Sequence, residues 1–146
     1  MITHTIYFLI FITSLTGFAQ DYSDYESMKT QSYMQNNFDP NCDSLDGNNA
    51  QHKICLNLEF QNIDSMMNKK YIEYLSTVKI DSVKLNIINF QNAWVKNRKK
   101  QSQLKALDYK GHISSIYYIS SMCFITKKRL EELEFLIDDR LIISSH

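Results

Sequence analysis

The chain has 146 residues, and its 16 lysines and arginines are balanced by 16 aspartates and glutamates. This balance excludes a global electrostatic field that would attract nucleic acid or anionic lipid. A chain of this length supplies one domain with a single core, so a second domain is not expected.

The first 19 residues have the pattern of an export signal. The apolar run from Ile6 to Phe18 has 13 residues, whereas a helix that spans a bilayer needs roughly 20. Small residues at Gly17 and Ala19 fit cleavage after Ala19. The segment has no lysine or arginine, which leaves an uncleaved anchor or a buried N-terminal helix as the alternative. We therefore expect a periplasmic or secreted protein with no stable membrane anchor after cleavage.

Residues 20–41 are polar and lack a sustained apolar period. We expect a flexible lead-in here, with at most a short helix near Tyr25–Met34. Acidic residues dominate from Gln20 to Asp46. Such a run is typical of a solvated surface, and the steering of a cationic partner is the second interpretation.

Residues 42–140 carry the periodicity of a helical domain. Apolar residues recur every three to five positions from about Asn49 to Thr77, which predicts a first long helix with one buried face. Asp81 or Ser82 can cap a second helix that runs toward Leu107. Gly111 separates it from a third helix, which Ser114 or Ser115 can cap and which continues past Ile137.

No segment alternates apolar and polar residues for long enough to predict a strand. Three helices joined by short turns pack as an antiparallel bundle. The predicted fold class is therefore all-α: a small antiparallel three-helix bundle behind a mobile N-terminal lead-in.

Polar side chains share the apolar face of each predicted helix, at spacings of three, four and seven residues. They are Asp64, Asn68 and Tyr71 on the first helix, Gln91, Trp94 and Arg98 on the second, and Thr126 and Arg129 on the third. A buried charge without a partner costs several kcal/mol. We therefore expect Asp64 to pair with Arg98 or Arg129 in a polar network that sets the helix register; ligand binding is the alternative.

Three cysteines allow one disulfide and leave one thiol over. Cys42 and Cys55 are close in sequence, and a bridge between them closes a short loop worth about 3 kcal/mol in the chain-entropy model. Cys123 is then the odd one. It lies on an apolar face, which favours a buried, inert thiol over a reactive one, although a bridge to a partner chain is also possible.

Several of these residues, taken in order, resemble the motifs of the LprI-type lysozyme-inhibitor family. Residues 63–71 resemble its D-x-x-L-N-x-x-Y signature, and residues 90–98 resemble its Q-x-A-W-x-x-x-R core. Gly111 with Ser114 and the C-x-x-x-T-x-x-R-x-x-x-L pattern of residues 123–133 resemble its closing segments. Cys42 and Cys55 match its paired N-terminal cysteines, and the resemblance covers roughly residues 42–136.

Two departures from the family pattern stand out. Ser102 occupies the position, four residues after the motif arginine, where the family usually has a cysteine. If the family's cysteine at this position forms a disulfide with the cysteine that matches Cys123, then this chain lacks a disulfide between its second and third helices. Met67 replaces the usual leucine, which conserves volume and costs little.

The resemblance implies a protein that binds and inhibits lysozyme by occluding its glycan cleft, and we expect a protein partner, with the oligomeric state open. The connection with Tyr109, Lys110, Gly111 and His112 is the candidate partner-binding loop; an ordinary helix connection is its alternative. An envelope interaction or immunity protein of the same fold is one alternative. The other is an enzyme acting on cell-wall material, for which the sequence lacks an arranged acid and base pair. The sequence has neither a glycine-rich phosphate loop nor a nucleophile elbow, and its four histidines are scattered. It therefore predicts no catalytic residue, no cofactor site and no metal site.

Overall fold

The computed structural model describes residues 22–35, 42 and 48–144. This part of the chain is built from helices and contains no strand. In order they are α2 (Tyr22–Lys29), the 3-10 helix η2 (Ser32–Met34), α3 (Asn49–Thr77), α4 (Asp81–Ala106) and α5 (Gly111–Ser144). The expected all-helical class is confirmed for the described residues.

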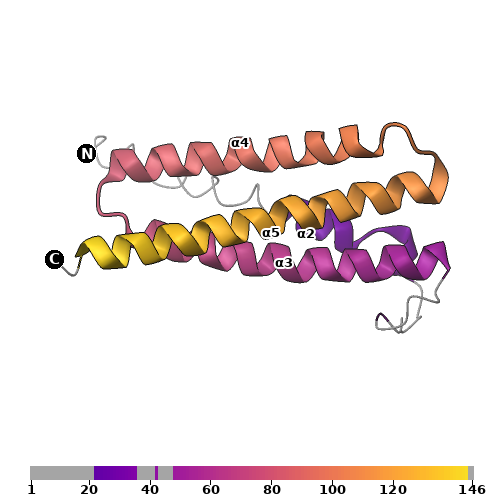
Figure 1. The fold of residues 1–146 in the computed structure, drawn as a ribbon, viewed down its shortest axis with the longest axis horizontal. Coiled ribbons are helices and arrows are strands. Elements are labelled where there is room, and N and C mark those ends of the chain that lie inside the picture. The colour runs from indigo at the N-terminus through magenta and orange to yellow at the C-terminus, as the bar shows by residue number, and fades with distance from the viewer. Residues whose placement is uncertain (1–21, 36–41, 43–47, 145–146) are drawn as a thin grey trace, which may run out of the picture.

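The long helices alternate in direction: in Figure 1, α3 and α5 run from right to left and α4 runs from left to right. α5 packs along both α3 and α4, whereas the backbones of α3 and α4 approach each other little. α2 and η2 lie against α3. The space between α3 and α4 is therefore bridged by long side chains, and these prove to be polar and aromatic.

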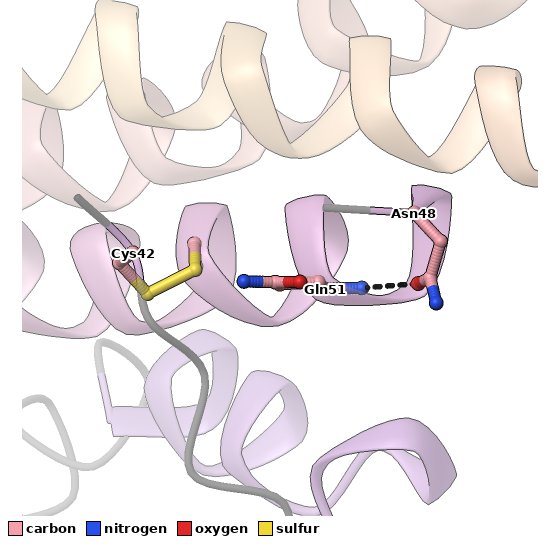
Figure 2. Close-up of a disulfide and its surroundings, with 4 residues drawn as sticks. Cys42, Asn48 and Gln51 are labelled. Atoms are coloured by element: carbon pink, nitrogen blue, oxygen red, sulfur yellow. Dashed lines mark hydrogen bonds between the residues drawn. A yellow bond between two sulfur atoms is a disulfide. The ribbon is translucent and has the colours of Figure 1, made fainter. Parts of the chain in front are cut away.

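α3 has the bounds that its periodicity predicts, and its start is well stabilised. The side chain of Asn48 accepts hydrogen bonds from the backbone N–H groups of Ala50 (3.0 Å) and Gln51 (3.1 Å), which satisfies donors that a helix start leaves free. The Cys42–Cys55 disulfide ties residue 42 to the second turn of the same helix (Figure 2). The predicted pairing is confirmed, and Cys123 is a free, buried thiol.

The starts of α4 and α5 differ from the prediction. Ile80, not Asp81 or Ser82, is the N-cap of α4, and its side chain accepts no hydrogen bond. α5 begins at Gly111, whose φ of +60° belongs to a region open to glycine. Ser114 does not cap α5, because its hydroxyl donates to the carbonyl of Ala106 (3.2 Å) and so joins the end of α4 to the start of α5.

Residues 22–35, expected to be a flexible lead-in with at most a short helix near Tyr25–Met34, form α2 and η2. Met28 is buried in the core, and the amide of Asn57 on α3 donates both to the Met28 carbonyl (2.8 Å) and to the Tyr33 hydroxyl (2.9 Å). These contacts attach the segment to α3, although the segment has no apolar periodicity of its own. The expectations for residues 1–19, 20–21 and 36–41 fall outside the described residues.

Two apolar clusters form the core. One is made of Met28, Phe60, Ile63, Ile119, Met122 and Cys123, and the other of Met67, Tyr71, Tyr74, Leu75, Leu133 and Ile137. Full burial of one large apolar side chain contributes about 1.5–3 kcal/mol. On α3 and on α5, a buried polar residue lies between the two clusters: Asp64 on α3 and Thr126 on α5.

None of the described helices combines the length and the apolar character that crossing a membrane requires.

Candidate functional site

A buried layer of charged residues separates the two apolar clusters, and Arg98 of α4 is its centre. The side chains of Arg98 and Asp64 are both completely buried, at 0% exposure. A buried guanidinium of this kind is tolerated only when carboxylates and hydrogen bonds compensate it.

Arg98 meets partners from three other helices. Its Nη1 donates to Asp64 on α3 and to the Thr126 hydroxyl on α5 (3.0 Å). Its Nη2 donates to Asp24 on α2 (3.2 Å). Thr126 in turn donates to the Met122 carbonyl (2.6 Å). Of the two partners predicted for Asp64, the structure therefore selects Arg98, and it adds a second carboxylate.

Asp24 is the member of this layer that sequence reasoning missed. Its carboxylate lies between Arg98 and the ammonium of Lys99 (3.3 Å), and it is almost fully buried. It lies in the lead-in, where no periodicity marks it, and 74 residues separate it from Arg98. A single acid in an acidic stretch carries no signal that would single it out. This burial also removes Asp24 from any role in steering a partner.

Arg129 of α5 lies in a second set of contacts. Its Nε donates to the side-chain oxygen of Gln91 (3.0 Å), and its Nη1 pairs with Glu132 (2.8 Å). Gln91 donates in turn to the sulfur of Met67 (3.3 Å). Arg129 therefore does not share Asp64 with Arg98, and its charge is balanced at the rim by a half-exposed glutamate.

Aromatic rings lie against both guanidinium groups. The Arg98 group lies 5.2 Å from the Phe60 ring and 4.9 Å from Trp94. The Arg129 group lies 5.9 Å from Trp94 and 4.9 Å from Phe90. Trp94 thus contacts both arginines, and each desolvated cation–π contact adds about 0.5–2 kcal/mol. The motif tryptophan and the motif arginines form one structural unit.

The remaining predicted residues lie around this layer. Asn68 donates to Asp64 (3.4 Å), and Tyr71 is buried in the second apolar cluster. Burial raises the pKa of Asp64, although the charge and hydrogen bond of Arg98 oppose that shift. Asn68 Oδ1, Arg98 Nε and Ser102 Oγ are buried without a hydrogen-bond partner among the described residues.

Chemically, this layer is enclosed and its charges are compensated within it. Asp64 and Arg98 do not reach solvent, so a substrate cannot reach an acid or a base there. Within residues 22–35, 42 and 48–144, no three histidine, cysteine or acidic side chains come together as a metal site. The arrangement can hold four helices in register.

The candidate partner-binding loop lies at one end of the molecule, where α4 connects to α5 (Figure 1). Tyr109 and Lys110 lie in the connection, but Gly111 and His112 belong to the first turn of α5, so the loop is shorter than predicted. All four residues are exposed. The Tyr109 ring stacks on Tyr117 of α5, with ring centroids 3.9 Å apart, which holds the connection against the helix.

Apolar side chains extend this exposed region, which we call the tip surface. Leu104 and Leu107 are 68% and 70% exposed, and Ile113 is also exposed. The tip surface consists of Leu104, Leu107, Tyr109, Lys110, Gly111, His112, Ile113 and Tyr117. Exposed apolar residues gathered at one place are typical of a protein contact.

Cys123 shows no sign of reactivity. It is 4% exposed and donates weakly to the Leu56 carbonyl (3.4 Å). Burial, with a smaller effect of Glu59, raises the pKa of its thiol to about 12. The thiolate that nucleophilic or redox chemistry needs is therefore absent at neutral pH.

Comparison with known proteins places these features in a family. The family model described as "Lysozyme inhibitor LprI" matches residues 42–133. The match begins at the first cysteine of the disulfide and ends beyond Arg129. No curated protein matches the chain, and no solved structure does.

Proposed function

Since this chain belongs to the LprI lysozyme-inhibitor family, we propose that it is a secreted or periplasmic protein that inhibits a lysozyme by covering the enzyme's glycan cleft. The family match over residues 42–133 is the observation that carries this proposal.

The tip surface is the contact element that we propose. It projects at the α4–α5 end and offers aromatic and aliphatic side chains that a contact would bury, which is the composition of interface cores. It also carries one exposed ammonium, Lys110. Lysozyme cleaves glycans with two carboxyl groups in its cleft, so a cation at the tip has a complementary target there.

Titration of purified residues 20–146 against several lysozyme types in a cell-wall lysis assay tests the function. We expect dose-dependent slowing with at least one type. Absence of slowing with every type would overturn the inhibitor proposal and favour an envelope interaction or immunity protein of the same fold.

Variants test the contact element. Lys110→Glu reverses the charge at the tip, and we expect it to weaken inhibition at least tenfold, because a carboxylate would face carboxylates. Lys69→Glu makes the same change at an exposed position on α3 and serves as the matched control. Equal inhibition by both variants would place the contact elsewhere.

A further inference from the structure

A cavity of about 430 Å³ lies between α2, the C-terminal half of α4 and the N-terminal half of α5. Its size lies within the range of pockets that hold small molecules. It borders the charge layer, since Asp24 of that layer and its partner Lys99 are among the lining residues.

The floor of the cavity is apolar and its wall is polar. Met28, Ile119 and Met122 form buried apolar surface. Ser115, Tyr118 and Gln103 also line it. The structure gives the side chains of these three no hydrogen-bond partner within the described residues, so their hydroxyl and amide groups remain available to a ligand.

The two charges on the wall compensate each other. Lys99 donates to Asp24, and Asp24 also receives a hydrogen bond from Arg98. An anionic ligand would meet the carboxylate of Asp24 beside Lys99, the only cation among the described lining residues. A cationic ligand would compete with Arg98 and Lys99, which already bind Asp24. The lining therefore favours a ligand without net charge.

The polar wall also argues against a purely apolar ligand. Such a ligand would cover hydroxyl and amide groups without bonding them, and an unsatisfied polar group is costly. Burial raises the pKa of Tyr118, so its hydroxyl remains a donor at neutral pH. The required ligand has an apolar face for the methionines and several hydroxyl or amide groups for the wall.

We propose that this cavity binds a short neutral saccharide, whose ring presents apolar C–H faces and a rim of hydroxyl groups. Tyrosine rings and methionine side chains cover the faces, and Ser115, Tyr118 and Gln103 bond the rim. The proposal does not depend on lysozyme inhibition. Leu107 and Tyr109 line the cavity and also belong to the tip surface, so a bound sugar would lie beside the proposed contact.

Calorimetric or NMR titration of purified residues 20–146, the preparation of the lysis assay, tests the proposal. The probes are cellobiose and the disaccharide of N-acetylglucosamine, with inorganic phosphate and benzene as the anionic and apolar alternatives. We expect saturable binding of at least one disaccharide at millimolar concentration and none of phosphate or benzene. Binding of neither disaccharide, or tighter binding of phosphate or benzene, would overturn the proposal.

Two variants locate the site. Tyr118→Phe and Ser115→Ala each delete a hydroxyl while keeping the helix and most of the packing, and each should weaken sugar binding five- to tenfold. Ser120→Ala makes the same change as Ser115→Ala at an exposed position of α5 that does not line the cavity, and it should leave affinity unchanged. Unchanged affinity in both cavity variants would refute the assignment. The same variants are also measured in the lysis assay. Loss of sugar binding with inhibition retained, or the reverse, then distinguishes a failure of this proposal from a failure of the inhibitor proposal.

Discussion

Replacing Arg98 by an apolar residue, without also replacing its acidic partners, would leave buried carboxylates without a cation. Its guanidinium holds two carboxylates, Asp64 and Asp24, that lie on different helices. Removal of one partner of a buried ion pair leaves a charge without compensation, which is far more costly than the pair's net contribution. The stability of the polar layer is therefore concentrated in this one side chain.

Arg98→Met should lower the free energy of unfolding by about 3–5 kcal/mol, because Asp64 remains buried without its cation. Glu59→Gln removes an exposed ion pair with Lys127 and should cost at most about 1 kcal/mol. Urea unfolding followed by circular dichroism measures both values. A loss below about 1 kcal/mol for Arg98→Met would show that the buried layer does not carry this stability.

The thiol of Cys123 links stability to alkaline pH. Its pKa is raised from an ordinary value of 9.0 to about 12 in the folded chain, so above pH 9 the unfolded chain loses a proton that the folded chain keeps. The stability that the protonated thiol contributes is fully present below pH 9, and it is lost as the pH rises toward 12. Relative to Cys123→Ala, the wild-type chain should lose about 1.4 kcal/mol between pH 7 and pH 10. Urea unfolding of both chains at pH 7 and pH 10 measures this difference. An equal change in the free energy of unfolding of the two chains would contradict the prediction.

At the scale of the elements, periodicity predicted the long helices well because each buries one face. The bounds of α3 were predicted correctly. The start of α5 was not, because Gly111 adopts a positive φ and enters the helix directly, while Ser114 bonds Ala106 across the turn. Local capping rules describe one helix at a time, and they cannot foresee a hydroxyl that is used between two helices.

The unequal caps of α3 and α4 lead to opposite expectations. Asn48→Ala removes the two cap hydrogen bonds of α3 and should cost about 1 kcal/mol. Ile80→Asp would supply a cap that α4 lacks, at a residue that is 62% exposed, and should add about 0.5–1 kcal/mol. Thermal unfolding of the two variants should shift the midpoint in opposite directions. A lower midpoint for Ile80→Asp would contradict the cap argument.

The disulfide should act on the N-terminal end of α3. Replacement of Cys42 and Cys55 by serine opens a loop with a sequence separation of 13 and should cost about 3 kcal/mol in the chain-entropy model. The same loss should follow when a reductant is added to the wild-type chain. Cys123→Ala, which leaves the bridge intact, is the control. Unfolding curves that do not respond to reductant would refute this role.

At the scale of the whole molecule, the charge layer joins all four described α-helices, and sequence reasoning found most but not all of it. Asp64, Gln91, Arg98, Thr126 and Arg129 were predicted because each shares a face with apolar residues. Asp24 was not, since α2 has no buried face of sufficient length to reveal itself. The cavity escaped prediction for the same reason, because its lining comes from segments that are distant in sequence.

Asp24→Asn should release α2 while leaving the three long helices in place. The substitution removes the charge that bonds Arg98 and Lys99, but Asp64 still compensates Arg98. Hydrogen exchange of the backbone amides in α2 should accelerate at least tenfold, and exchange in the middle of α3 should change little. Equal acceleration in both helices would mean that α2 is not an independent unit.

The bond between Asp24 and Arg98 also orders events in time. A ribosome makes the chain from its N-terminus, so Asp24 emerges long before the residue that neutralises it. Residues 22–29 must then wait until α4 exists and turns back toward them. α2, the first of the described helices, is thus among the last of them to reach its native position.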